Sequence, residues 1–112
     1  METSSNLFLF QDEIAWHPAG DGIRRQILGY DDQIMLVKVE FEKGAIGSEH
    51  SHFHRQSTYV VSGVFEFTIN GVTKTVREGD GVFVPSNAIH GTVCIEPGIL
   101  IDTFTPTRED FI

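Results

Sequence analysis

The sequence is poor in cysteine, in positive charge and in long apolar runs, and each shortage removes a class of protein. Cys94 is the only cysteine among the 112 residues, whereas small secreted domains usually depend on several disulfides. Only eight Lys and Arg oppose 16 Asp and Glu, which gives a net charge of −8. A field of that sign repels phosphate backbones and anionic lipids, so we expect no nucleic-acid partner.

No apolar stretch approaches the ~20 residues that cross a membrane, so no membrane partner is expected. The apolar run at residues 7–10 is also shorter than the ~7 to 15 residues of a signal-peptide core. With the single cysteine, these features favour a cytoplasmic protein. A chain of this length fits one domain, which we expect to cover residues 1–112.

Alternating hydrophobic residues indicate β-strands. Residues 34–42 place Met35, Val37, Val39 and Phe41 on one face, which predicts a half-buried strand. Residues 65–69 and 72–77 flank Asn70-Gly71, a pair that favours the positive φ angles of a two-residue hairpin turn. Further strands are expected at residues 23–30, 58–62, 81–84, 90–95 and 99–105.

Many short strands without a helical period favour an antiparallel sandwich or barrel. Residues 7–10 could form an edge strand or pair across a dimer. At the other end, Thr107 is followed three residues later by Asp110, which predicts a single capped turn.

The clearest chemical signal is a group of histidines. His50, His52 and His54 lie within five residues, and His90 follows much later. Positions two apart in a strand share a face, so His50 and His52 could direct both imidazoles at one ion. Gln56 offers an amide oxygen, and with His90 the set becomes three nitrogens and one oxygen. The alternative is that these are exposed or structural strand histidines.

Two longer patterns contain these residues. The first, at 44–63, is Gly44, five residues, His50-x-His52, three residues, Gln56, six residues and Gly63. The second, at 79–94, is Gly79, five residues, Pro85-x-Asn87, two residues, His90, three residues and Cys94. Together they resemble the two motifs of the cupin family, with Gln56 for the usual Glu, Asn87 for Gly and Cys94 for Asn.

The cupin resemblance implies an all-β fold, a double-stranded β-helix or jelly-roll barrel, with one divalent transition metal inside its mouth and often a homodimer. A neutral Gln56 ligand leaves the charge of the ion uncompensated, which favours an anionic substrate. Imidazole and amide ligands suit Ni, Zn, Fe or Mn alike. His54 falls in the bend before Gln56, where a supporting or surface position is favoured over a ligand.

A second candidate group lies near the C-terminus. Leu100, Asp102 and Phe104 share one face of a predicted strand, and an inward Asp is costly unless it is paired or functional. Arg108 could fold back toward Asp102. Spacing alone does not separate a working pair from a solvated ion pair at the chain end.

Residues 22–112 also resemble the small cupins of pectin and alginate degradation that act on unsaturated uronates. The stretches that carry this resemblance are Gly22-Ile23-Arg24-Arg25 and residues 35–44, 63–69 and 102–111. It implies that Asp102 and Arg108 are catalytic and that Phe104 and Arg108 contact the sugar. It also implies that the metal ligands are His50, His52, Gln56 and His90.

The activity implied by this resemblance is isomerase-like. The enzyme would convert 4,5-unsaturated monouronates, which are small anionic sugars released by lyases, into linear 5-keto-4-deoxyuronates. Two alternatives stay open at this point: another metal-dependent cupin enzyme, such as a dioxygenase or sugar isomerase, and a non-catalytic sugar-binding cupin. Arg24 and Arg25 alternate in direction, so at most one of them should line a pocket.

Overall fold

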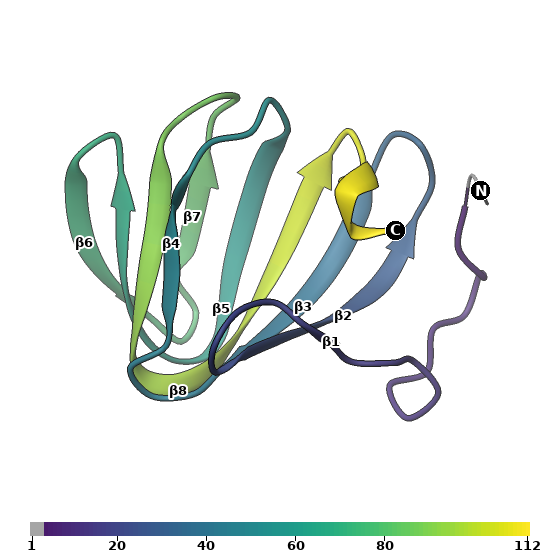
Figure 1. Ribbon diagram of the computed structural model, residues 1–112, viewed down its shortest axis with the longest axis horizontal. Helices are drawn as coiled ribbons and strands as arrows, with labels where there is room; N and C mark the ends of the chain where they lie inside the picture. The colour runs from purple at the N-terminus through teal and green to yellow at the C-terminus, as the bar shows by residue number, and fades with distance from the viewer. Residues whose placement is uncertain (1–3) are drawn as a thin grey trace.

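The computed structural model describes residues 4–112, which form a curved antiparallel β structure (Figure 1). The strands are β1 (His17–Pro18), β2 (Ile23–Tyr30), β3 (Met35–Phe41), β4 (Ile46–His50), β5 (Arg55–Ile69), β6 (Val72–Arg77), β7 (Gly81–Val84) and β8 (His90–Thr105). The only helical element in the described part of the chain is a 3-10 turn, η1 (Glu109–Phe111). The all-β jelly-roll prediction is confirmed.

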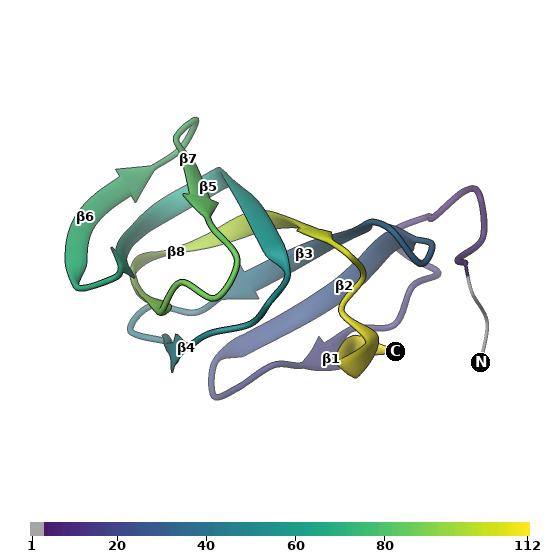
Figure 2. The same ribbon diagram turned by 90° about the horizontal axis from the view of Figure 1, so that it is seen from above.

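Two long strands, β5 and β8, connect the two halves of the jelly roll. The second half of β8 pairs with β3 and with the start of β5, whereas its first half pairs with β4 and with the end of β5. The short strands β7 and β6 pair with the first and second halves of β5. Viewed from above, the strands curve around a common interior (Figure 2).

The sequence predicted two strands where β5 runs and two where β8 runs, and this division is wrong. Each pair is one continuous strand that bends where Gly63 and Gly98 meet. Gly63 has a φ of +88°, and a Cβ atom on it would lie 2.6 Å from the Gly98 Cα. Glycine therefore lets the two strands touch, so both can turn from one sheet into the other without ending.

Gly63→Ala should consequently destabilise the fold by about 3 kcal/mol or more, because the added methyl group meets backbone atoms and the φ is unfavourable for alanine. Gly81→Ala is the matched control, since its Cβ would make only an ordinary 3.6 Å contact with the Thr58 carbonyl. Urea unfolding of both variants checks this. Equal stability of the two variants would contradict the role of the bend.

The local strand predictions that depended on alternation are confirmed. Met35, Val37, Val39 and Phe41 of β3 are all buried. The β5–β6 hairpin turns at Asn70-Gly71, whose φ angles are +48° and +82°. The buried hydrophobic residues form one cluster, in which the Phe41 and Phe65 rings meet edge to face with their centroids 5.1 Å apart.

The two chain ends depart from local expectations in different ways. Residues 7–10 form no edge strand, and Leu7 and Phe8 are 93% and 77% exposed, while the alternative of pairing across a dimer stays a prediction. The turn at the other end exists as η1, but no side chain caps it. The Thr107 hydroxyl instead donates to the carbonyls of Asp31 and Ile34, which ties the C-terminal segment to the β2–β3 connection. Within residues 4–112, no helix is long and apolar enough to span a membrane.

Candidate metal centre and active site

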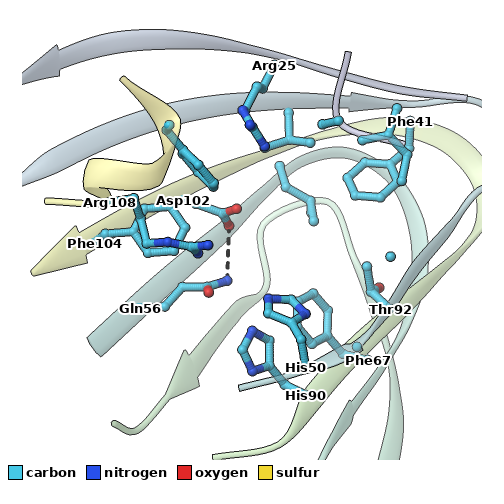
Figure 3. Close-up of a pocket in the computed structure, with 17 residues that line it drawn as sticks. Arg25, Phe41, His50, Gln56, Phe67, His90, Thr92, Asp102, Phe104 and Arg108 are labelled. Carbon is cyan, nitrogen blue, oxygen red and sulfur yellow. Dashed lines mark hydrogen bonds between the residues drawn. The ribbon is translucent and has the colours of Figure 1, made fainter. Parts of the chain in front are cut away.

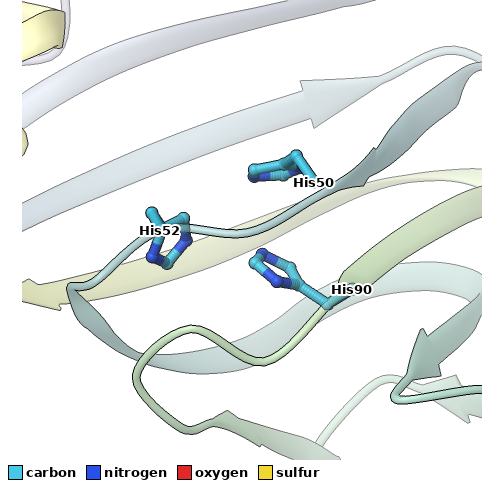
Figure 4. A group of neighbouring side chains, drawn as sticks. All are labelled: His50, His52 and His90. Carbon is cyan, nitrogen blue, oxygen red and sulfur yellow. The ribbon is translucent and has the colours of Figure 1, made fainter.

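Three histidines converge at one end of the jelly roll. His50 is the last residue of β4 and lies opposite His90, the first residue of β8. His52 lies two residues beyond the end of β4, so the prediction that His50 and His52 share a strand is wrong. The ring centroids are nevertheless 4.4 to 5.5 Å apart, and the potential ligand atoms all lie within 4.8 Å of one another (Figure 4).

The loop that carries His52 is held by the second sequence motif. The backbone N–H of Asn87 donates to the His52 carbonyl at 2.8 Å, and the Ser86 hydroxyl donates to the Phe53 carbonyl at 2.6 Å. Asn87 has a φ of +65°, which explains how Asn replaces the Gly of the cupin pattern, since Asn tolerates this region better than most residues. The motif 2 loop therefore positions a motif 1 ligand.

Backbone carbonyls orient all three imidazole rings. Each Nδ1 lies 2.9 to 3.0 Å from a carbonyl oxygen two residues away in the sequence. These carbonyls belong to Ser48, His54 and Ala88. A carbonyl only accepts hydrogen bonds, so each Nδ1 carries the proton and each Nε2 presents a lone pair, as a metal ligand must.

The charge state of the histidines also suits metal binding. Burial lowers the pKa of His52, and the nearby Arg108 cation lowers it further. Burial likewise lowers the pKa of His90. Both rings are therefore neutral at neutral pH, which is the form that coordinates a metal.

Gln56, in β5, completes the candidate ligand set. Its Oε1 lies 3.1 Å from the His52 Nε2, while its Nε2 donates to the Thr58 hydroxyl at 3.0 Å and approaches the Asp102 carboxylate at 3.4 Å. With the His52 proton on Nδ1, two lone-pair atoms face each other across 3.1 Å. Such an arrangement would be favourable if both atoms bound one cation, so these residues fit a divalent transition metal.

His54 supports this centre through its backbone. Its side chain is buried and does not belong to the group of converging ligand atoms, whereas its carbonyl accepts the hydrogen bond from His52. His54 therefore occupies a supporting position, as the sequence favoured.

Asp102 lies beside the metal centre, on the inner face of β8. It is paired in register with Thr58 of β5, and the Thr58 hydroxyl donates to Asp102 Oδ1 at 2.6 Å. Burial raises the pKa of Asp102 to about 6, although the hydrogen bond from Thr58 and the charge of Arg108 oppose the shift. The inward carboxyl is therefore poised to exchange a proton near neutral pH.

Sequence reasoning missed Thr58, although a signal was present. Thr58 lies two residues after Gln56 and two before the fully buried Val60, so all three share the inner face of β5. A polar side chain at such a position requires a partner, and its partners are Gln56 and Asp102. Thr58 thus connects the candidate ligand to the candidate proton carrier.

The raised pKa of Asp102 predicts a pH-dependent stability. The metal-free folded protein binds the Asp102 proton more tightly than the unfolded chain does. This contribution to stability is fully present below pH ~4 and is lost as the pH rises through about 6. Asp102→Asn removes the titration and keeps an acceptor for Thr58. Its stability relative to the natural protein should therefore increase by about 1 to 3 kcal/mol between pH 4 and pH 7.5.

Urea unfolding in the presence of a chelator, at several pH values, measures this difference. A stability difference that does not change with pH would show that the carboxyl titrates normally. The same data establish whether the variant folds, which the activity measurements require.

Arg108 and Phe104 line the same cavity as Asp102. The Arg108 guanidinium binds the Asp110 carboxylate through two hydrogen bonds of 2.8 and 3.0 Å and stacks against the Phe104 and Phe111 rings. Its ion pair is therefore with Asp110, and not with Asp102 toward which the sequence suggested it could fold. Phe104 is buried, with its ring 5.7 Å from that of His52.

A cavity of about 210 Å³ brings these groups together (Figure 3). Its lining includes six of the seven residues that the sequence singled out: His50, Gln56, His90, Asp102, Phe104 and Arg108. Apolar side chains, among them Phe41, Phe67 and Leu100, form much of the remaining wall. A site of this kind can hold a small polar molecule against a metal, with an acid of nearly neutral pKa beside it.

The fold is a jelly roll with three histidines that could hold a metal ion, and the profile of the cupin domain matches residues 37–104. The chain belongs to the cupin family. Over 107 residues it is 44% identical to the pectin degradation protein KdgF of Dickeya dadantii (strain 3937), covering 94% of this chain and 97% of that protein.

Solved structures agree with this similarity. KdgF from Halomonas sp. superposes with a TM-score of 0.91 at 35% identity, covering 96% of this chain and all of that one. An RmlC-like cupin from Shewanella frigidimarina NCIMB 400 superposes with a TM-score of 0.96 at 45% identity, covering 99% and 100% of the two chains. The likeness extends over nearly the entire length and includes the C-terminal segment that carries Asp102 and Arg108.

Proposed function

We propose that this protein is an isomerase-like enzyme that converts 4,5-unsaturated monouronates, released by pectin or alginate lyases, into linear 5-keto-4-deoxyuronates. The observation that carries this proposal is the position of Asp102. Its carboxyl, with a pKa of about 6, lies within one cavity with His50 and His90 and is connected to Gln56 through Thr58. The similarity to KdgF proteins supports the same activity.

The reaction requires two proton transfers and no oxidant. A proton leaves the anomeric hydroxyl as the bond between C1 and the ring oxygen breaks, which gives an aldehyde at C1 and an enolate at C5. The enolate becomes a ketone when C4 accepts a proton. One proton is lost and one is gained, so a single carboxyl group could accept the first and deliver the second.

Asp102 is assigned this proton transfer. A carboxyl with a pKa near 6 is partly ionised at neutral pH, so it can act as a base and then as an acid. Arg108 would stabilise negative charge that develops on the substrate oxygens, and Phe104 would form an apolar wall against the sugar ring. A divalent ion held by His50, His52, Gln56 and His90 would supply Lewis acidity toward a substrate oxygen.

The direct test is incubation of the purified, metal-loaded protein with monouronates from both lyase classes. Loss of the ultraviolet absorbance of the conjugated double bond measures the rate against a protein-free control, and NMR identifies the product. A linear ketone formed without oxygen consumption supports the proposal and excludes a dioxygenase. A saturating complex from which unchanged uronate is recovered would instead indicate a sugar-binding protein.

We further propose that residues 1–112 act as one cupin domain that forms a homodimer in the cytoplasm. Exposed apolar side chains on the outer face of β5 and β7 support the dimer: Tyr59, Val61 and Phe83 are all well exposed. Light scattering should give twice the mass of the chain, and Tyr59→Lys should reduce it. A monomeric mass for the natural protein would contradict the dimer.

A further inference from the structure

Arg25 is a second cation at the candidate active site. It lies on β2, and its side chain reaches into the same cavity, on the side away from His50 and His90 (Figure 3). Its guanidinium carbon lies 3.7 Å from the centre of the Phe111 ring, a stacked position that fixes the orientation of the planar group. Arg24, the preceding residue, points to the outside, as the alternation of the strand predicted.

Within residues 4–112, Arg25 has no anionic partner at ion-pair distance. Arg24 is paired with Glu40 at 2.8 Å, and Arg108 is paired with Asp110 through two hydrogen bonds. The Nε of Arg25, by contrast, is buried and makes no hydrogen bond. A half-buried guanidinium with an unused donor is costly unless a ligand supplies the acceptor.

The neighbouring charges increase this demand for an anion. Burial lowers the pKa of Arg25, and the Arg108 cation lowers it further, while Asp110 opposes the shift. Asp110 already accepts both hydrogen bonds from Arg108, so its negative charge mainly compensates Arg108 and not Arg25. An anion in the cavity would therefore be attracted by two adjacent guanidinium groups, of which only Arg25 has no carboxylate partner among the described residues.

We propose, on the basis of the proposed function, that Arg25 binds the carboxylate of the sugar substrate and so restricts the site to uronates rather than neutral sugars. The planar guanidinium, held flat by Phe111, matches the two oxygens of a carboxylate. A sugar anchored there extends toward Asp102, His50 and His90, because these residues line the same cavity. Arg25 thus selects for a negatively charged substrate, whereas Asp102 carries out the proton transfer.

The test compares the natural protein with Arg25→Met and Arg24→Met. Methionine keeps an apolar stem against Phe111 and removes the charge, and Arg24 is a matched control from the same strand and the opposite face. Turnover is measured with unsaturated monouronate. Binding is measured separately by calorimetry with galacturonate, an unreactive saturated uronate, and with its neutral methyl ester.

Arg25→Met should raise the KM for the unsaturated uronate and the Kd for galacturonate by roughly 10- to 100-fold, the value of a charge-assisted bidentate contact. KM should change while kcat stays nearly the same. The neutral methyl ester should bind equally to the natural protein and to Arg25→Met. Arg24→Met should behave like the natural protein in all of these measurements. Arg25→Lys should recover only part of the affinity, because an ammonium group lacks the planar pair of donors.

Unchanged galacturonate binding by Arg25→Met would overturn the assignment. Failure of the proposed function has a different signature, which is the absence of turnover by the natural protein. Because galacturonate binding requires no reaction, its loss in Arg25→Met would still support the carboxylate site in that case.

Discussion

Asp102→Asn should reduce kcat for unsaturated monouronates by about 10²- to 10⁴-fold, the usual contribution of a positioned acid or base. Asparagine has nearly the same shape and still accepts a hydrogen bond from Thr58, but it cannot exchange a proton. The loss should therefore appear in kcat, with the metal content and the fold retained. The assay is the decrease of ultraviolet absorbance under saturating substrate.

Glu66→Gln provides the control for this experiment, since Glu66 is an exposed carboxylate on the same strand as Thr58. It should behave like the natural protein. A near-normal rate in Asp102→Asn, with an intact fold and a full metal load, would exclude Asp102 as the proton carrier. A second group in the cavity would then have to be sought.

His90→Ala should abolish tight metal binding and, with it, nearly all turnover. His90 is the buried member of the three histidines, and its ring centroid lies within 4.9 Å of both others. Its removal leaves two imidazoles and one amide oxygen, a set that binds divalent metals far more weakly. Elemental analysis after dialysis gives the metal stoichiometry, and the absorbance assay gives the activity.

His17→Ala is the matched control, because His17 lies on β1, is exposed and is absent from the converging group. It should retain the metal. A fully loaded His90→Ala protein would contradict the ligand assignment. Treatment of the natural protein with a chelator, followed by return of Ni, Zn, Fe or Mn one at a time, would identify which of these metals restores turnover.

The parts of this protein that could be predicted from sequence are those set by local spacing. Alternation located β3, and Asn70-Gly71 located the β5–β6 hairpin, because strand periodicity and turn geometry depend only on near neighbours. The spacing of His50, His52 and His90 within two motifs was sufficient to predict that these residues converge. The inward direction of Asp102 followed from the same periodicity.

The remaining features depend on how distant segments meet. The link from Thr58 to Asp102 requires the register between β5 and β8, and the proton position on each histidine requires carbonyls whose direction the loops determine. The choice of Asp110 as the partner of Arg108 depends on the η1 turn. Continuous strands through Gly63 and Gly98 could not be inferred, because glycine also commonly ends strands.

One continuous strand carries a histidine of the metal centre at its beginning and the proposed proton carrier near its end, since β8 starts at His90 and includes Asp102. The interval between this histidine and the acid is thus set by a single backbone. Surface turns such as Asn70-Gly71 can change in sequence or length without altering it. Inserting one residue between Gly98 and Asp102 would turn the carboxyl outward, so this stretch of β8 should tolerate far less change in length than the surface turns do.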